Sequence, residues 1–215
     1  MLQPDAKDRR RGDYHSQLTM NACTHWVLAD QIEKVAPSVE AQSWLLEAGS
    51  ITARLKHRWP GTRVRLVYEG PDTPFPEECL RLGLQPNSTC WVREVRLHAA
   101  EQLLVHARTV VPHWGPGNPW HDLSALGERP LGELLFQLPD LQRSPLEFGL
   151  THPETLNGDS NGLAQGPLNQ PASRPARRCT YTRDGAALLL TEAFDFLIAS
   201  PARGSRSQQT KKKPK

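Results

Sequence analysis

The chain has 215 residues, of which 38% are hydrophobic and 23% charged, so a folded domain fits the composition better than a fully disordered chain. The formal net charge is only +3, and much of the basic excess lies in residues 9–11 and 211–215, which argues against a nucleic-acid-binding domain. The four cysteines form no Cys-x-x-Cys pair and have no histidine cluster beside them, so we expect reduced thiols, no metal site and a cytoplasmic protein without a membrane span.

We expect one domain over residues 23–200, with a flexible N-terminal extension at 1–22 and a basic disordered tail at 201–215. Residues 151–176 are dominated by Gly, Asn, Gln, Pro and Ser, and predict a flexible insertion within that domain. Apolar periodicity predicts the elements in chain order. They are two short helices within 38–59, a strand at 63–69, a helix at 77–83, strands at 90–97 and 103–111, helical pieces near 121–126 and 130–137, and strands at 178–183 and 186–198.

Two dipeptides set the local geometry. Gly49-Ser50 separates the two helices of residues 38–59, and Ser50 is suited to cap the second one. Asp184-Gly185 is a hairpin-turn dipeptide between two strand patterns. Strands joined this closely pair antiparallel, so the sequence predicts an antiparallel sheet of about five or six strands with helices packed on one side, an α+β domain.

Two of the expected strands place a charge among apolar side chains. In "CWVREVRL", Arg93 shares a face with Trp91, Val95 and Leu97. In the strand at 186–198, Glu192 shares a face with leucine, phenylalanine and isoleucine side chains. An unpaired buried charge costs several kcal/mol, so each of these groups needs a partner or a shifted pKa.

Three interpretations stay open for these charges. Arg93 and Glu192 can form a buried ion pair with each other, or a β-bulge can turn one of them towards solvent. The third depends on the hairpin: with its loop centred at 100–101, Arg93 faces Arg108, and His106 lies nearby. Two facing guanidiniums favour a small anion with two carboxylates, with Glu192 near its other end. A register slip of one residue would move Arg108 to the opposite face.

Four blocks in this order, "WVREVRL", "LLVHARTVVP", "RPLGELLF" and "LLLTEAF", resemble the chorismate pyruvate-lyase family. The match runs from about Trp44 to Phe196, apart from residues 151–176. The resemblance implies a six-stranded antiparallel sheet whose helices enclose an internal ligand cavity. It also implies a lyase that eliminates pyruvate from chorismate to give 4-hydroxybenzoate, the first step toward ubiquinone, with no metal or organic cofactor.

The resemblance assigns roles to individual residues. Arg93 is expected to bind the ring carboxylate, helped by the backbone amides of Ile51 and Leu131, and Glu192 to lie at the ring hydroxyl. Arg108 matches an arginine expected near the enolpyruvyl chain, so the expected catalytic residues are Arg93, Glu192 and Arg108. Ile51 stands where relatives often have methionine, a change that a backbone contact tolerates.

The alternative is a non-catalytic effector-binding domain of a transcription regulator, because "ARTVVP"-like strands also resemble that class. Such regulators carry a winged helix ahead of the domain, and residues 1–22 lack helical periodicity, which favours the enzyme. A third reading is a scaffold whose basic tail contacts anionic lipid or RNA. We therefore expect a monomer that binds chorismate, releases 4-hydroxybenzoate and pyruvate, retains its product, and has neither a nucleic-acid partner nor stable membrane insertion.

Overall fold

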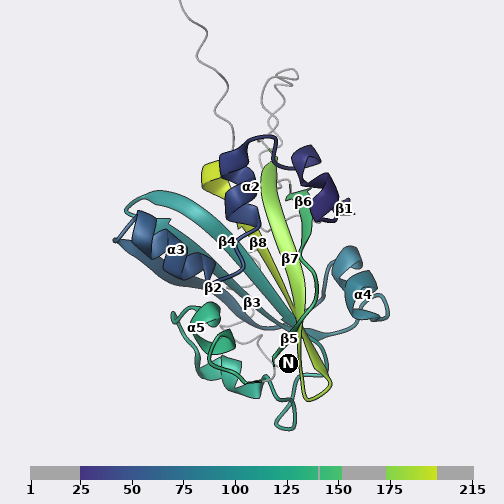
Figure 1. The fold of residues 1–215 in the computed structure, drawn as a ribbon. Coiled ribbons are helices and arrows are strands. Elements are labelled where there is room, and N and C mark those ends of the chain that lie inside the picture. The colour runs from purple at the N-terminus through teal and green to yellow at the C-terminus, as the bar shows by residue number, and fades with distance from the viewer. Residues whose placement is uncertain (1–24, 140, 152–172, 198–215) are drawn as a thin grey trace, which may run out of the picture.

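The computed structural model describes residues 25–139, 141–151 and 173–197. Its described part contains one antiparallel sheet of eight strands in the order β1-β6-β7-β8-β4-β3-β2, with β5 paired to β7 (Figure 1). The five predicted strands are confirmed, while β1, β5 and β6 were not predicted. The strands are β1 (Trp26–Val27), β2 (Thr62–Asp72), β3 (Cys90–Ala99), β4 (Gln102–Val111), β5 (Gln142–Arg143), β6 (Glu147–Thr151), β7 (Arg174–Arg183) and β8 (Ala186–Phe194).

The helices also follow the predicted order. They are α2 (Val39–Leu45), α3 (Ile51–Arg58), α4 (Pro76–Leu82) and α5 (Leu131–Leu135), with 3-10 helices η1 (Ala29–Lys34), η2 (His121–Ala125) and η3 (Asp195–Leu197). The predicted cap is confirmed, because the Ser50 side chain accepts a hydrogen bond from the Ala53 amide at 3.2 Å. The strand predicted to reach residue 198 ends earlier, at Phe194, and η3 begins at the next residue, Asp195.

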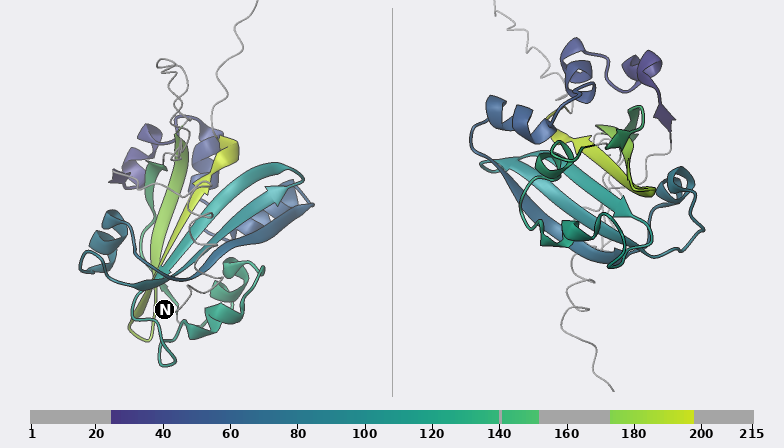
Figure 2. Two further views of the ribbon diagram at one scale, coloured as in Figure 1. Left: turned by 180° about the vertical axis from the view of Figure 1, so that it is seen from behind. Right: turned by 60° about the horizontal axis from the view of Figure 1, so that its bottom comes forward.

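The sheet has two differently covered faces, which we call the inner face and the outer face. The inner face carries Arg93, Val95 and Leu97 of β3, and the outer face carries Glu94 and Arg96. Apolar residues of α2, α3 and α5 pack on the inner face, while α4 contributes to a separate cluster on the outer face. Figure 1 shows α3 in front of β2 and β3 with α5 beside it, and Figure 2 shows α4 beyond β7.

A β-bulge in the β3–β4 hairpin corrects the predicted register. Next to the turn, Ala99 pairs with Gln102 as predicted. Leu97 then pairs with Val105, so Leu104 is one extra residue in β4 and every pair beyond it shifts by one. Arg93 therefore faces Thr109, and the predicted pairing of Arg93 with Arg108 is wrong.

The β7–β8 hairpin has the tight turn that its dipeptide predicted. Asp184 and Gly185 both have positive φ, +48° and +77°, which matches the right-handed twist of the flanking strands. Arg183 pairs with Ala186 directly beside this turn. The ladder continues without a shift and brings Arg177 opposite Glu192.

Parts of the predicted domain organisation lie outside the described residues. These are the extension at 1–22, the tail at 201–215 and most of the insertion at 151–176. The insertion was predicted too wide, because Thr151 belongs to β6 and residues 174–176 belong to β7. In the described part of the chain no helix is long and apolar enough to cross a membrane.

Candidate active site

A pocket lies on the inner face, between the sheet and the first turns of α3 and α5. Four of the five predicted site residues line it: Arg93, Glu192, Ile51 and Leu131. They come from four elements that are distant in the sequence, so the fold gathers them. The fifth predicted residue, Arg108, does not line this pocket.

The sheet separates Arg93 from Glu192 and leaves room between them. Along β4, Thr109 pairs with Arg93, and Ala107 pairs with Glu192. The two charged residues are thus two strands and two residues apart, a Cα separation of roughly 12 Å at ordinary sheet spacings. Arg93 lies near Glu69, and Glu192 pairs with Arg177, so the two charges line the pocket without pairing with each other. The first of the three interpretations is therefore wrong.

Arg93 is fully buried at the side of the pocket formed by β2, β3 and the loop before α5. Its Nη2 donates hydrogen bonds to the carbonyl oxygens of Gly127 at 2.7 Å and Arg129 at 3.2 Å. Glu69 of β2 supplies a carboxylate, but at 3.7 Å from Arg93 Nε. Burial lowers the pKa of Arg93, and Glu69 offsets this only in part. The guanidinium is oriented mostly by neutral oxygens, so its charge is only partly compensated.

Glu192 has a different partner, Arg177 of β7. Arg177 Nε donates to Glu192 Oε2 at 2.7 Å, and Arg177 Nη1 donates to the carbonyl oxygens of Leu45 at 3.2 Å and Glu47 at 2.6 Å. Both Arg177 and Glu192 line the pocket. The pocket therefore has a guanidinium on one side and a guanidinium–carboxylate pair on the other.

The N-termini of α3 and α5 meet at the pocket. Ile51 and Leu131 are the first residues of these helices, and amides of a first helical turn lack acceptors within the helix. The two helices approach so closely that a Cβ on Gly132 would lie 2.9 Å from Ser50 Oγ. An exposed ion pair, Lys56 Nζ to Glu133 Oε1 at 3.3 Å, also joins them.

Tyr181 adds a hydroxyl group to the pocket wall. Burial strongly raises the pKa of Tyr181, with a further rise from Cys179. At neutral pH the phenol is protonated, so it can donate a hydrogen bond but cannot act as a base. Glu192 is thus the better candidate for accepting a proton or hydrogen bond at this end.

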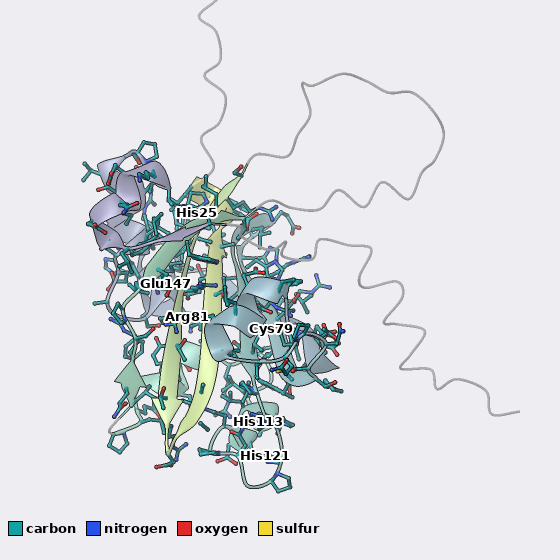
Figure 3. The ribbon with its side chains drawn as sticks, turned by 90° about the vertical axis from the view of Figure 1, so that its right-hand side faces the viewer. His25, Cys79, Arg81, His113, His121 and Glu147 are labelled. Carbon is teal, nitrogen blue, oxygen red and sulfur yellow. The ribbon has the colours of Figure 1, made fainter. Side chains whose placement is uncertain are left out.

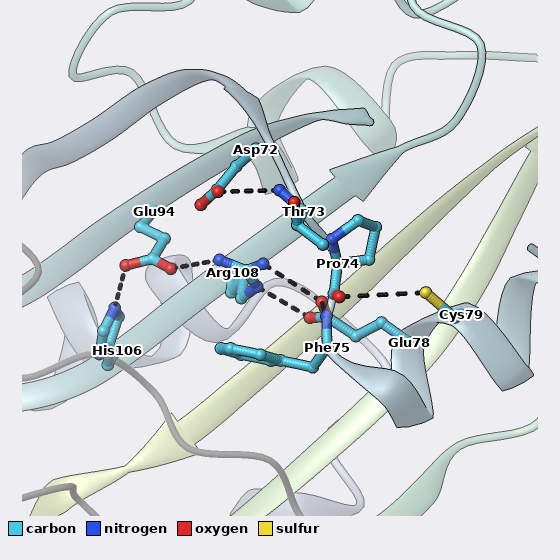
Figure 4. A network of polar contacts seen from close by, with 9 residues as sticks. All are labelled: Asp72, Thr73, Pro74, Phe75, Glu78, Cys79, Glu94, His106 and Arg108. Carbon is cyan, nitrogen blue, oxygen red and sulfur yellow. Dashed lines mark hydrogen bonds and ion pairs between the residues drawn. The ribbon is translucent and has the colours of Figure 1, made fainter. Parts of the chain in front are cut away.

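Arg108 lies on the outer face, in a buried ion network (Figure 4). Arg108 Nε and Nη2 donate to the two oxygens of Glu78 at 2.9 and 3.2 Å, and Nη1 donates to Glu94. His106 Nε2 lies 3.4 Å from the other oxygen of Glu94. The predicted inner-face position of Arg108 and His106 is therefore wrong, because the bulge at Leu104 turns both residues to the opposite face.

The outer face has a second ion cluster at the edge of α4. Glu147 of β6 lies 3.1 Å from Arg81 Nε and 2.6 Å from Arg178 Nε. Arg81 and Glu147 lie next to each other in Figure 3. Arg178 also lies over the ring of Trp26, at 4.2 Å from its centroid. These contacts fasten α4 and β1 to the sheet on the side away from the pocket.

Sequence reasoning missed Arg177, although the signal was present. A two-residue turn at Asp184-Gly185 pairs residue 183 with 186, and each step away from the turn pairs the next two residues. Six steps along this ladder Arg177 pairs with Glu192, but the predicted strand began at residue 178 and so left Arg177 out. Among the described residues, no group of three or more His, Cys, Asp or Glu side chains could hold a metal ion.

Comparison with known proteins identifies the family of this chain. Residues 20–200 match the family model for chorismate lyase. The chain belongs to the chorismate lyase family. A probable chorismate pyruvate-lyase of Hydrogenovibrio crunogenus is 36% identical over 179 residues, covering 83% of this chain and 94% of the relative. One of Marinobacter nauticus is 39% identical over 166 residues, covering 76% of this chain and 81% of the relative.

The family that the four sequence blocks predicted is thereby confirmed. Among solved structures, the effector domain of PhnF from Mycobacterium smegmatis covers 69% of this chain and 90% of its own length. Its identity is 14% and its TM-score 0.43. This likeness is too distant to carry an argument about function.

Proposed function

We propose that this chain is a chorismate pyruvate-lyase that converts chorismate to 4-hydroxybenzoate and pyruvate. The observation that carries the proposal is the placement of Arg93 and Glu192 on opposite sides of one pocket, with a floor of small residues between them. Chorismate has a ring carboxylate at one end and a ring hydroxyl at the other. A buried cation and a carboxylate separated by the width of a ring complement these two ends.

Arg93 binds the ring carboxylate in this proposal. Its guanidinium is buried, and neutral carbonyl oxygens of Gly127 and Arg129 hold it in one orientation. A ligand carboxylate then supplies the full countercharge that Glu69 at 3.7 Å does not. The first-turn amides of Ile51 and Leu131, which the family resemblance assigns to ligand binding, lie at the same pocket.

Glu192 lies at the hydroxyl end and accepts its hydrogen bond. Arg177 Nε, which donates to Glu192 Oε2 at 2.7 Å, holds this carboxylate in place. The ring hydroxyl of both chorismate and 4-hydroxybenzoate is a donor, so the same contact serves substrate and product. Glu192 thereby fixes the orientation of the ring about the carboxylate anchored by Arg93.

The chemistry asks for alignment and charge stabilisation. The proton on the hydroxyl-bearing carbon leaves, and its electron pair forms the last double bond of the aromatic ring. The neighbouring carbon–oxygen bond breaks, and its electrons depart with the enolpyruvyl oxygen, whose enolate takes up a proton to become pyruvate. Aromatisation drives the reaction, so the pocket contributes by holding the reacting conformer and stabilising the departing enolate.

The pocket also explains why product retention is expected. We propose that α3 and α5 enclose the ligand, because their N-termini touch at Ser50 and Gly132. Product can leave only when these helices separate, which makes release a conformational step. Slow dissociation of 4-hydroxybenzoate in stopped-flow measurements is the expected result.

A direct assay tests the function. Purified protein is incubated with chorismate and a metal chelator, and 4-hydroxybenzoate and pyruvate are measured independently. The two products are expected in equal amounts, with no delay between them. A ligand-binding domain without catalysis would bind 4-hydroxybenzoate yet release no pyruvate, and that outcome would exclude the proposed function.

A further inference from the structure

We propose that Arg177 binds the enolpyruvyl carboxylate of chorismate and stabilises pyruvate as it leaves. The proposal rests on the proposed function, and it gives Arg177 the role that the sequence had assigned to Arg108. Both are buried arginines, on the two strands β4 and β7 that flank β8, but only Arg177 lines the pocket.

The chemistry of the substrate places the leaving group beside Arg177. In chorismate, the carbon that bears the enolpyruvyl ether is next to the carbon that bears the hydroxyl. A side chain that contacts Glu192 at the hydroxyl end is therefore also next to the ether. Arg177 Nε is 2.7 Å from Glu192 Oε2, and no other cation of the described pocket lining is on this side.

Arg177 is held in place before any ligand binds. Its Nε and Nη1 are engaged with Glu192 and with the carbonyl oxygens of Leu45 and Glu47. Within the described part of the chain, these contacts leave Nη2 for a ligand oxygen. A cation fixed in this way stabilises developing negative charge without reorganising during the reaction.

Charge complementarity supports the same assignment. Chorismate brings two carboxylates into the pocket, and Arg93 is committed to the one on the ring. Without Arg177, the second carboxylate would enter a buried site beside the carboxylate of Glu192, and like charges at such distances repel strongly. Arg177 offsets both anions from its position between them.

In this proposal Arg177 acts in the elimination step, when the carbon–oxygen bond breaks. As the carbon–oxygen bond breaks, negative charge moves onto the enolpyruvyl oxygen while the side-chain carboxylate stays ionised. The departing group therefore carries more negative charge in the transition state than in bound chorismate. An arginine beside it contributes more to turnover than to binding of 4-hydroxybenzoate, which lacks the enolpyruvyl group.

The test must distinguish this catalytic role from a purely structural one, because Arg177 also donates hydrogen bonds to the turn between α2 and α3. The test compares Arg177→Gln with Arg178→Gln, since Arg178 is adjacent, similarly buried and paired with Glu147 on the outer face. We measure kcat and KM for chorismate and Kd for 4-hydroxybenzoate. Arg177→Gln is expected to lower kcat/KM about 100-fold or more while Kd changes less than about 3-fold. Arg178→Gln should leave both within about 3-fold.

A modified substrate makes the test specific to the second carboxylate. Chorismate esterified with methanol at the enolpyruvyl carboxylate removes that charge from the ligand. Wild type should process it about 100-fold less efficiently than chorismate, whereas Arg177→Gln should discriminate less than about 3-fold. Equal penalties in both proteins, or a parallel loss of product affinity and turnover in Arg177→Gln, would overturn the proposal. If wild type fails to cleave chorismate at all, the proposed function itself fails.

Discussion

Arg93 and Arg108 lie on adjacent strands, and each is 2% exposed, yet they face opposite sides of the sheet. On the outer face, Arg108 has two carboxylates, Glu78 and Glu94, within hydrogen-bonding distance. On the inner face, Arg93 has two carbonyl oxygens and one carboxylate at 3.7 Å. Burial alone therefore does not mark a ligand-binding arginine; what matters is how much countercharge the protein itself supplies.

The pKa directions of these two arginines express the same difference. Burial lowers the pKa of Arg93, and Glu69 does not make up the loss. Burial also opposes the charge on Arg108, but Glu78 and Glu94 outweigh it and raise the pKa of Arg108. The outer-face cation is stabilised by the fold, whereas the inner-face cation is stabilised further when an anion binds.

Of the substitutions proposed here, removal of Arg108 should have the largest effect, and this effect should be on the stability of the fold. Arg108→Ala leaves Glu78 buried without this countercharge and Glu94 with His106 alone, so we expect the free energy of unfolding to fall by about 3–5 kcal/mol in urea titrations. The affinity of the folded fraction for 4-hydroxybenzoate should stay within about 3-fold of wild type. Arg183→Ala is the control, because its pair with Asp184 is exposed and is worth less than about 1 kcal/mol. A stable Arg108→Ala protein that cannot bind product would break the comparison.

Removing Arg93 should act on binding instead. Arg93→Ala is expected to weaken 4-hydroxybenzoate binding about 100- to 1000-fold in calorimetric titrations, because a buried ligand carboxylate loses the one guanidinium that the described pocket lining has on that side. Turnover should fall in parallel, while the free energy of unfolding changes by at most about 2 kcal/mol. Wild-type product affinity in this variant would show that the inner-face cation is not the anchor.

The outer-face network should also make the stability of the fold depend on pH in the acid range. Burial by itself would raise the pKa of Glu94, but His106 and Arg108 outweigh it and lower that pKa from 4.5 to about 2. Because the folded-state pKa is the lower one, this stabilisation is complete above the unfolded pKa and is lost as pH falls from about 4.5 towards about 2. Chemical denaturation across this window should show a shallower pH dependence for Glu94→Gln than for wild type. Identical slopes would mean that Glu94 does not contribute.

The contact between α3 and α5 offers a smaller effect confined to the inner face. A methyl group in Gly132→Ala would meet Ser50 Oγ at 2.9 Å, and Ser50 cannot retreat without losing its hydrogen bond to Ala53. We expect 4-hydroxybenzoate to dissociate about 3- to 10-fold faster in stopped-flow experiments, a cost of about 1 kcal/mol. Gly117→Ala is the matched control, since its Cβ would meet nothing within 4 Å. Unchanged dissociation in Gly132→Ala would argue against closure at this contact.

The exposed pair between Lys56 and Glu133 should have the smallest effect. Both side chains are about half exposed, so the pair contributes less than about 1 kcal/mol. Lys56→Ala should speed product dissociation less than about 3-fold, and added salt should reduce the difference from wild type. Lys34→Ala, on η1 and outside the pocket lining, is the comparison. Product dissociation that is much faster in Lys56→Ala would mean that this ion pair itself holds α3 and α5 closed over the product.

Local patterns determined much of the fold. Alternation of apolar residues located the five long predicted strands, Ser50 marked the start of α3, and Asp184-Gly185 marked the β7–β8 turn. These features depend on neighbouring residues in the chain, whose periodicity and turn chemistry are visible in the sequence. The same patterns exposed Arg93 and Glu192 as charges on apolar faces, and both line the pocket.

Only the tertiary structure decided that Arg108 does not join them. One extra residue at Leu104 sends Arg108 to the outer face, whereas the position of Arg177 opposite Glu192 follows from the β7–β8 turn. Strand β6 is short and is positioned by pairing with β1 and β7, which are both distant from it in the sequence. A bulge and a distant strand partner are set by packing over the whole sheet, because a shift of one residue leaves the apolar alternation of a strand intact while reversing the face of every side chain beyond it.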